Sequence, residues 1–233
     1  MENIFHRVSI RKYQDKPVEK EKIMQILKAG MQAPSACNQQ PWEFYVVTDK
    51  EKIEELSKAT PYSKCAAGAP VVIVPVYRTK GLVVQDMAQI DMSIAQQNIW
   101  LETDALGLGG VFVGGVRNET EKMAKLFGLP ELVFPMYVVC MGYPAEVPPQ
   151  RPRMDASLIS AVDTYPEITG PEQLADYEKE VSDYFLNITN GRSGRGWIAR
   201  AEHAISVKPR YSVGEFLHKA GFMTASGPSE NSR

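Results

Sequence analysis

The sequence predicts an α+β domain in three layers, with helices on both sides of a central sheet. Amphipathic helical patterns alternate along the chain with short apolar runs, which are typical of buried strands. Strand–helix units are too few for a doubly wound parallel sheet, so an α+β arrangement is favoured. With 233 residues the chain is long enough to bury a full core.

The first elements are a helix, a strand and a second helix. Residues 18–31 predict the first helix, because apolar Ile23 and Ile26 lie about one turn apart on the same face. A short apolar run over 44–48 predicts a buried strand. Asp49 follows this strand and can cap the next helix, since its carboxylate can accept hydrogen bonds from the first free amides.

A second strand and the longest helix come next. The run over 71–74 is apolar at every position, so we expect a strand that is buried on both faces. Pro75 lacks a backbone donor and therefore predicts an edge strand or a bulge. The longest helix is predicted over 85–106 and is apolar around much of its circumference. Its polar Gln96 then needs a partner, which a ligand or a subunit interface could supply.

Further strands are predicted over 111–113 and 136–141. Between them, Asn118 and Glu121 match a capping box and predict the start of another helix. Pro171 is placed at the beginning of a charged helix, because the fixed backbone angle of proline suits the first helical turn. Helices therefore dominate the last part of the chain.

Composition and charge exclude several classes of protein. The formal net charge of -2 argues against a nucleic-acid partner, and no apolar run reaches the roughly 18 residues that span a bilayer. No secretory signal is visible, and three unclustered cysteines fit a reducing compartment, so a cytoplasmic protein is expected. The scattered His6, His203 and His218 support neither a metal site nor a cysteine–histidine dyad.

Arg7, Ser9 and Arg11 stand at alternate positions of the first segment. In an extended chain their side chains leave the same face, and in a helical turn the two arginines are still neighbours. Two guanidinium groups and a hydroxyl then converge, which suits a phosphate monoester. The segment therefore predicts a phosphorylated ligand.

A second pair of arginines, Arg151 and Arg153, flanks Pro152. The proline disfavours helix at the residue before it and keeps the pair extended. With the first segment, this pair could enclose a phosphate, although surface arginines that bind no ligand are common. Neither the glycine fingerprint of dinucleotide-binding folds nor a Walker sequence is present, so phosphate binding must depend on other residues.

Residues 33–42, with the sequence APSACNQQPW, form a small polar loop punctuated by prolines. Such a loop can bring backbone groups close to a planar ligand. Cys37 lies within it, but no spacing-matched histidine accompanies it, so we expect a small packing residue rather than a nucleophile.

These stretches resemble the nitroreductase superfamily of FMN flavoproteins, in the family's order, over residues 5–162. The matching motifs are Arg7-x-Ser9-x-Arg11-x-Tyr13, Ala33-Pro34-Ser35-x-x-Asn38-x-Gln40-Pro41-Trp42, the 91–110 helix with Gln97-Asn98, Gly114-Gly115, and Gly142-Tyr143-Pro144 followed by Arg151-x-Arg153. Each motif alone is weak, but five in order are specific. Residues 215–222 also resemble the C-terminal extension of larger members.

The resemblance implies which residues bind FMN. Arg7 and Ser9, with Arg151 and Arg153, would hold its phosphate and ribityl chain, and Arg11 would lie at the pyrimidine edge of the flavin. The loop would contact the flavin of the other subunit, and the glycine pair would place backbone amides near N5 and O4. The implied cofactor-binding residues are Arg7, Val8, Ser9, Arg11, Pro34, Ser35, Ala36, Asn38, Gly114, Gly115, Arg151 and Arg153. No side chain is assigned as catalytic.

The resemblance also implies fold and assembly. It implies a nitroreductase-like three-layer fold with a mixed, mainly antiparallel sheet, and a homodimer with FMN at the subunit interface. Residues 1–165 would form the FMN-binding core, and residues 166–233 a helical extension that packs on the core or on the partner subunit.

The implied activity is that of an FMN-dependent NAD(P)H oxidoreductase. NADPH or NADH would pass a hydride to flavin N5, and an electron-poor acceptor such as a nitroaromatic or a quinone would then take two electrons at the same place. Two alternatives stay open. One is a specialised flavin-dependent reductase, for example one that removes a halide reductively, and the other is an FMN carrier or sensor without turnover.

Overall fold

The computed structural model describes residues 2–78, 85–167, 170–206 and 211–222. The chain divides into two compact units, Met1–Pro148 with Arg210–Arg233, and Pro149–Pro209. This division groups residues 149–165 with the second unit and α9 (Tyr211–Lys219) with the first. The expected domains, 1–165 and 166–233, stay a prediction.

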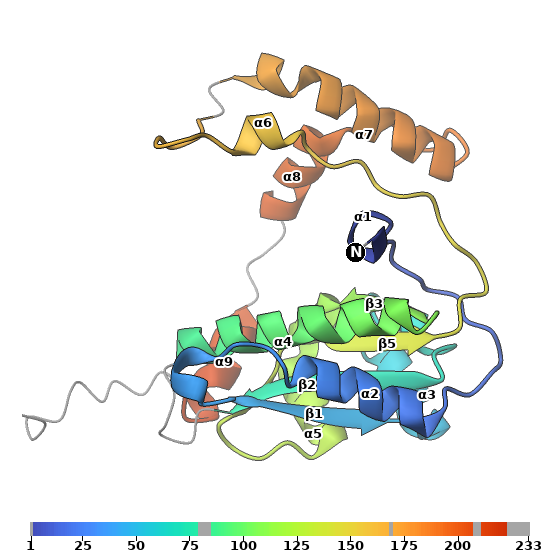
Figure 1. The fold of residues 1–233 in the computed structure, drawn as a ribbon, viewed down its shortest axis with the longest axis vertical. Coiled ribbons are helices and arrows are strands. Elements are labelled where there is room, and N and C mark those ends of the chain that lie inside the picture. The colour runs from blue at the N-terminus through green and yellow to red at the C-terminus, as the bar shows by residue number, and fades with distance from the viewer. Residues whose placement is uncertain (1, 79–84, 168–169, 207–210, 223–233) are drawn as a thin grey trace, which may run out of the picture. The chain divides into compact units, whose positions relative to one another are not determined.

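The first unit combines α-helices with one sheet (Figure 1). Its other helices are α1 (Glu2–Phe5), α2 (Lys20–Gly30), α3 (Lys50–Ala59), α4 (Gln85–Ala105) and α5 (Thr120–Phe127). Its strands are β1 (Trp42–Val47), β2 (Val71–Arg78), β3 (Gly109–Val113), β4 (Val133–Pro135) and β5 (Val138–Gly142). Short 3-10 helices are η1 (Ala36–Asn38), η2 (Lys64–Ala66) and η3 (Gly114–Glu119).

The sheet has the order β1–β2–β5–β3, and β4 also pairs with β2. Each of the described strand pairs is antiparallel. The central strand β2 pairs with β1 on one side and with β5 on the other, where Val72 lies opposite Cys140. This sheet confirms the expected α+β fold.

Both faces of the sheet are covered by helices, which makes three layers (Figure 1). Successive strand residues point to opposite faces, so neighbours in β2 join different cores. Helices α2 and α4 cover one face, and α3 and α5 cover the other. The buried side chains that join β2 to these helices are Ile26, Ile73 and Ile99 on one face and Leu56, Val72 and Met123 on the other.

Most of the expected elements are present. Helix α2 lies within the expected range 18–31, with Ile23 and Ile26 buried. Asp49 caps α3 as expected, because its Oδ1 accepts hydrogen bonds from the amides of Glu51 at 2.9 Å and Lys52 at 3.3 Å. Helix α4 covers nearly all of the expected range 85–106.

The edge or bulge expected at Pro75 is wrong. Strand β2 continues through Pro75 to Arg78 and lies in the interior of the sheet. Proline is tolerated there because β2 changes partners at this point: β5 pairs with it up to Ile73, and β4 pairs with it from Val76. The Pro75 carbonyl accepts a hydrogen bond from the amide of Met136 at 3.2 Å, which bridges the gap between the two partners.

The capping box expected from Asn118 and Glu121 is also wrong. Residues 114–119 form η3, and this 3-10 helix continues directly into α5. Glu119 therefore occupies the N-cap position, and no side chain caps the helix there. Asn118 lies inside η3 instead of at the N-cap position, so its side chain does not take the capping role.

The second unit is mainly helical. It contains α6 (Ala156–Ile159), η4 (Pro171–Leu174), α7 (Ala175–Ile188) and α8 (Trp197–Ser206). Pro171 begins η4, which leads into the expected charged helix α7. Gly191 follows shortly after the end of α7 and has a φ of 78°, a left-handed conformation that favours glycine.

Candidate functional site

In the first candidate segment the Arg7 side chain lies beside that of Ser9, and the Arg11 side chain bonds the main chain of Ser9. The Arg7 Nη1 lies 3.5 Å from the Ser9 Oγ, and the Arg11 Nη1 donates to the Ser9 carbonyl at 3.2 Å. Arg11 is exposed, and no carboxylate among the described residues forms a salt bridge with it. Both guanidinium groups therefore converge on Ser9, and that of Arg11 is accessible to an anion.

Ile10 fixes the orientation of this segment. Its amide donates to the Gly110 carbonyl of β3 at 2.8 Å, and its side chain is 3% exposed. A Cβ on Gly109 would lie 2.4 Å from the Ile10 side chain, so the close packing requires glycine there. Because neighbours alternate in an extended segment, a buried Ile10 turns Ser9 and Arg11 away from the core.

A buried carboxylate holds the second candidate segment. The Asp91 Oδ2 on α4 accepts a hydrogen bond from the amide of Ala36 at 3.0 Å, and Asp91 is 5% exposed. Within the loop, the Ser35 Oγ accepts a hydrogen bond from the amide of Gln40 at 3.0 Å. Sequence reasoning missed the role of Asp91, since the two partners are far apart in the chain.

The tip of this loop has an unusual backbone. Cys37, Asn38 and Gln40 have φ values of 51°, 55° and 48°, in the left-handed region. Such conformations cost about 1–3 kcal/mol each and often occur at ligand sites. Cys37 and Asn38 are exposed, so the expectation that Cys37 is a packing residue is wrong. The strained turn carries its side chain outward instead of into the core.

The glycine pair occupies the start of η3, directly after β3. A Cβ on Gly115 would lie 2.3 Å from the Cβ of Tyr62, so the packing of this tyrosine already requires glycine. A Cβ on Gly114 would meet only the Arg117 Nη2, at 3.2 Å. Packing within the protein therefore requires glycine less strictly at Gly114 than at Gly115.

Arg151 and Arg153 belong to the second unit, and their position beside Arg7 stays a prediction. Arg153 Nη1 donates to the carbonyls of Arg151 at 3.3 Å and Pro152 at 3.0 Å. Both arginines are exposed and line a cavity of about 430 Å³. The cavity is completed by Pro152, Tyr177, Val181, Tyr184, Phe185, Trp197, Arg200 and Ala201.

Guanidinium groups gather at this cavity. Arg200 lies over the ring of Phe185, 3.2 Å from its centroid, and Arg151 lies 5.7 Å from the same centroid. Partial burial, together with the nearby charges of Arg151 and Arg195, lowers the pKa of Arg200. In the described residues no carboxylate forms a salt bridge with Arg151, Arg153 or Arg200. The cavity is therefore suited to an anion.

Two side chains on α4 are buried without a described hydrogen-bond partner. They are Gln96, through both amide atoms, and Trp100, through its Nε1. Gln96 is 1% exposed, so the partner expected for it is absent from the described residues. Asn98, in contrast, donates to the Ala29 carbonyl at 3.2 Å and thereby links α4 to α2.

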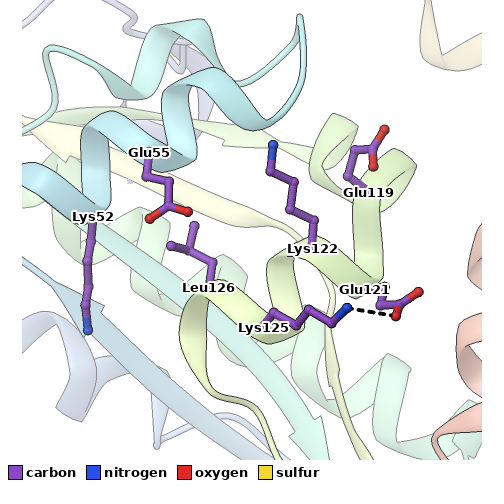
Figure 2. Close-up of a pocket in the computed structure, with 7 residues that line it drawn as sticks. All are labelled: Lys52, Glu55, Glu119, Glu121, Lys122, Lys125 and Leu126. Atoms are coloured by element: carbon purple, nitrogen blue, oxygen red, sulfur yellow. Dashed lines mark ion pairs between the residues drawn. The ribbon is translucent and has the colours of Figure 1, made fainter.

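A separate surface pocket between α3 and α5 is a weaker candidate (Figure 2). Its lining balances three lysines against three glutamates, so it favours neither sign of ligand charge. The lining residues are Lys52, Glu55, Glu119, Glu121, Lys122, Lys125 and Leu126.

Among the described residues, no cluster of three histidine, cysteine or acidic side chains could hold a metal ion. No helix in the described ranges is long and apolar enough to cross a membrane.

Comparison with known proteins identifies the family. Residues 4–143 match the Nitroreductase family, and residues 151–225 match the Nitroreductase family, C-terminal domain. The chain belongs to the nitroreductase family. The first match covers the part of the first unit that contains Arg7, the loop and the glycine pair, and the second covers most of the second unit together with α9.

Individual proteins match between two thirds and nearly all of the chain. A Bacillus subtilis FMN reductase [NAD(P)H] is 29% identical over 238 residues, covering 93% of this chain and 94% of that protein. A Methanothermobacter thermautotrophicus protein is 40% identical over 166 residues, covering 68% and 84%. The structure of the Vibrio harveyi NADPH:FMN oxidoreductase complexed with NAD+ has a TM-score of 0.86 at 25% identity, covering 96% and 98%.

Proposed function

We propose that this protein is an FMN-dependent NAD(P)H oxidoreductase that reduces nitroaromatics, quinones or similar electron-poor acceptors. Membership of the nitroreductase family supports the general activity. The names of its relatives, an FMN reductase [NAD(P)H] and an NADPH:FMN oxidoreductase, support NADPH or NADH as the electron donor. The acceptor class is inferred from the family alone.

The structural observation that best supports this proposal is that the guanidinium groups of Arg7 and Arg11 both approach Ser9. The donor set fits the phosphorylated tail of FMN, because guanidinium groups and a hydroxyl pair with phosphate oxygens through charge-assisted hydrogen bonds. Arg7 and Ser9 would bind this tail, with Val8 beside them. Arg11 would supply a fixed positive charge that favours electron uptake by a neighbouring ring.

Arg151 and Arg153 would complete the phosphate site. Their guanidinium groups are exposed at a cavity that gathers positive charge and offers no described carboxylate partner. Such a cavity attracts an anion more strongly than isolated surface arginines do, because neighbouring cations raise the local potential. This role requires that both units bind the same cofactor molecule.

The loop residues Pro34, Ser35, Ala36 and Asn38 would contact FMN bound by a second copy of the chain. Asp91 would act as their positioning residue, because its carboxylate holds the amide of Ala36. Gly114 and Gly115 would contact the cofactor through their backbone amides. Outside the neighbouring turn of chain, no main-chain atom lies within 4 Å of the point where a Cβ on Gly114 would stand, so glycine at this position leaves space beside the backbone for the cofactor.

A homodimer is supported by an apolar stripe on α4. Ile90 is 60% exposed and Ile94 is 37% exposed, and the two residues lie one turn apart on the same face. They line a surface cavity together with Met136. Apolar side chains that recur on one helix face gain most from burial against another chain. We place the assembled protein in the cytoplasm.

When bound, FMN supplies two-electron chemistry between the nicotinamide donor and the acceptor. The chain's own residues bind the cofactor, orient it and set the charge around it. No acidic or basic side chain needs to transfer a proton in this proposal, so we assign none as catalytic.

The test uses purified full-length protein. We expect bound FMN, and we expect NADPH or NADH to bleach its visible absorbance in the absence of oxygen. Bleaching should be followed by reoxidation when a nitroaromatic or a quinone is added. Protein that fails to bind FMN would refute the proposal, and protein that binds FMN without bleaching would be a carrier instead of an oxidoreductase.

A further inference from the structure

The Arg7 guanidinium lies over an aromatic ring. Its Cζ is 5.7 Å from the centroid of the Trp100 ring on α4. A guanidinium within about 6 Å of a ring centroid is attracted by the negative face of the π-system, and indole is the strongest of the protein rings in this respect. A cation–π contact therefore connects the first candidate segment to α4.

The Trp100 ring is itself held in place by β3. It is 2% exposed, and its centroid lies 5.1 Å from that of Phe112 on this strand. A Cβ on Gly110 would lie 3.3 Å from the Trp100 Cζ3, so the edge of the ring fits closely against the same strand. The Gly110 carbonyl also accepts the amide of Ile10. The ring and the candidate segment are therefore both fixed to β3.

Tryptophan carries a cost at this position. Its Nε1 is buried and has no hydrogen-bond partner among the described residues, and an unsatisfied buried donor lowers stability. A phenylalanine or a leucine could fill apolar space there without this cost. The indole adds a large π-face, which is the part of the side chain that Arg7 contacts. Packing alone therefore does not account for tryptophan at this position.

An aromatic ring holds a guanidinium without using its donors. A carboxylate would occupy N–H groups and offset the positive charge, whereas a ring attracts the guanidinium through its face. The N–H donors lie in the guanidinium plane, so they stay available to phosphate oxygens. A side chain that is fixed beforehand also loses less rotamer freedom when a ligand binds.

We propose that Trp100 is a positioning residue for Arg7, and that it strengthens the binding of a phosphorylated ligand through Arg7 instead of by direct contact. This inference rests on the proposed function, in which Arg7 binds the phosphate of FMN. It adds a residue of α4 to the phosphate site. The effect of Trp100 on affinity then depends both on the phosphate and on Arg7.

The test compares FMN with riboflavin, which is the same flavin without the phosphate. Equilibrium dialysis of purified full-length protein measures both dissociation constants. We expect Trp100→Leu to raise the constant of FMN about 2–30-fold and that of riboflavin less than about twofold. Trp100→Phe keeps a smaller π-face and should raise the FMN constant by less. In an Arg7→Ala background, Trp100→Leu should change the FMN constant less than about twofold.

Phe134→Leu is the matched control. Phe134 is a buried aromatic residue in a core cluster that does not include Trp100, so this variant should lower the melting temperature without changing the ratio of FMN to riboflavin affinity. Trp100→Phe carries the same comparison if Trp100→Leu does not fold.

Three results would overturn the inference. They are that Trp100→Leu weakens FMN and riboflavin equally, that it leaves both constants unchanged, or that it acts as strongly in the Arg7→Ala background. Wild-type protein that binds riboflavin as tightly as FMN would overturn the phosphate site of the proposed function, and the inference with it.

Discussion

Replacing Asp91 with alanine removes the only long-range side-chain hydrogen bond that the structure shows to the 35–40 loop among its described residues. The Asp91 carboxylate is 5% exposed and accepts the amide of Ala36 at 3.0 Å. Loss of this acceptor leaves the strained turn at Cys37 and Asn38 without its anchor on α4. The loop should then relax toward ordinary backbone angles.

The magnitude follows from the type of hydrogen bond. A hydrogen bond to a charged acceptor contributes about 1.5–3 kcal/mol to stability. For a chain of this size, 1 kcal/mol shifts the melting temperature by about 2–4 °C, so Asp91→Ala should lower it by about 3–12 °C. Asp91→Asn keeps an oxygen acceptor and should lose roughly half as much. Calorimetry or circular dichroism measures the shift, and an FMN titration measures the effect on binding.

Glu55→Ala is the matched control for this prediction. Glu55 is an exposed carboxylate on α3 (Figure 2), and its loss should change the free energy of unfolding by less than about 0.5 kcal/mol. If Asp91→Ala melts with wild-type protein and binds FMN as tightly, the carboxylate does not hold the loop, and the reasoning is refuted.

Three further predictions concern the phosphate site, the assembly and the ionisation of Cys65. Arg7→Ala should raise the dissociation constant of FMN about 10–150-fold by equilibrium dialysis, whereas exposed Lys12→Ala should change it less than about threefold. Ile90→Glu should convert a dimer to monomers in sedimentation experiments, because each dimer would lose two buried isoleucines worth about 1.5–3 kcal/mol each; a persistent dimer would exclude this face of α4. The alkylation rate of Cys65 should rise with pH through a midpoint of about 7, since the thiolate reacts. Cys140→Ala should move that midpoint upward by removing the hydrogen bond, and an unchanged midpoint would contradict the assigned cause.

Local sequence patterns predicted the elements that depend on interactions between residues close together in the chain. Asp49 caps α3 because the capping residue and the free amides are neighbours in sequence. The period of Ile23 and Ile26 predicted α2, and the alternation along the first segment predicted that Arg7 and Ser9 lie together. In each case the interacting groups lie within a few residues of one another.

Long-range pairing decided the features that sequence patterns missed. Pro75 is tolerated in an interior strand only because β5 and β4 meet β2 on either side of it. Asp91 contacts a loop that lies 55 residues earlier in the chain. No local periodicity reports such contacts, because they depend on the order of the strands.

Anaerobic titration of the FMN-loaded protein with NADPH and NADH measures whether the bound flavin accepts electrons from a nicotinamide. We expect loss of the visible flavin absorbance with about one equivalent of donor, and its return when an electron-poor acceptor is added, because both two-electron steps use the same cofactor. A flavin absorbance that neither nicotinamide changes would contradict the assignment as an oxidoreductase.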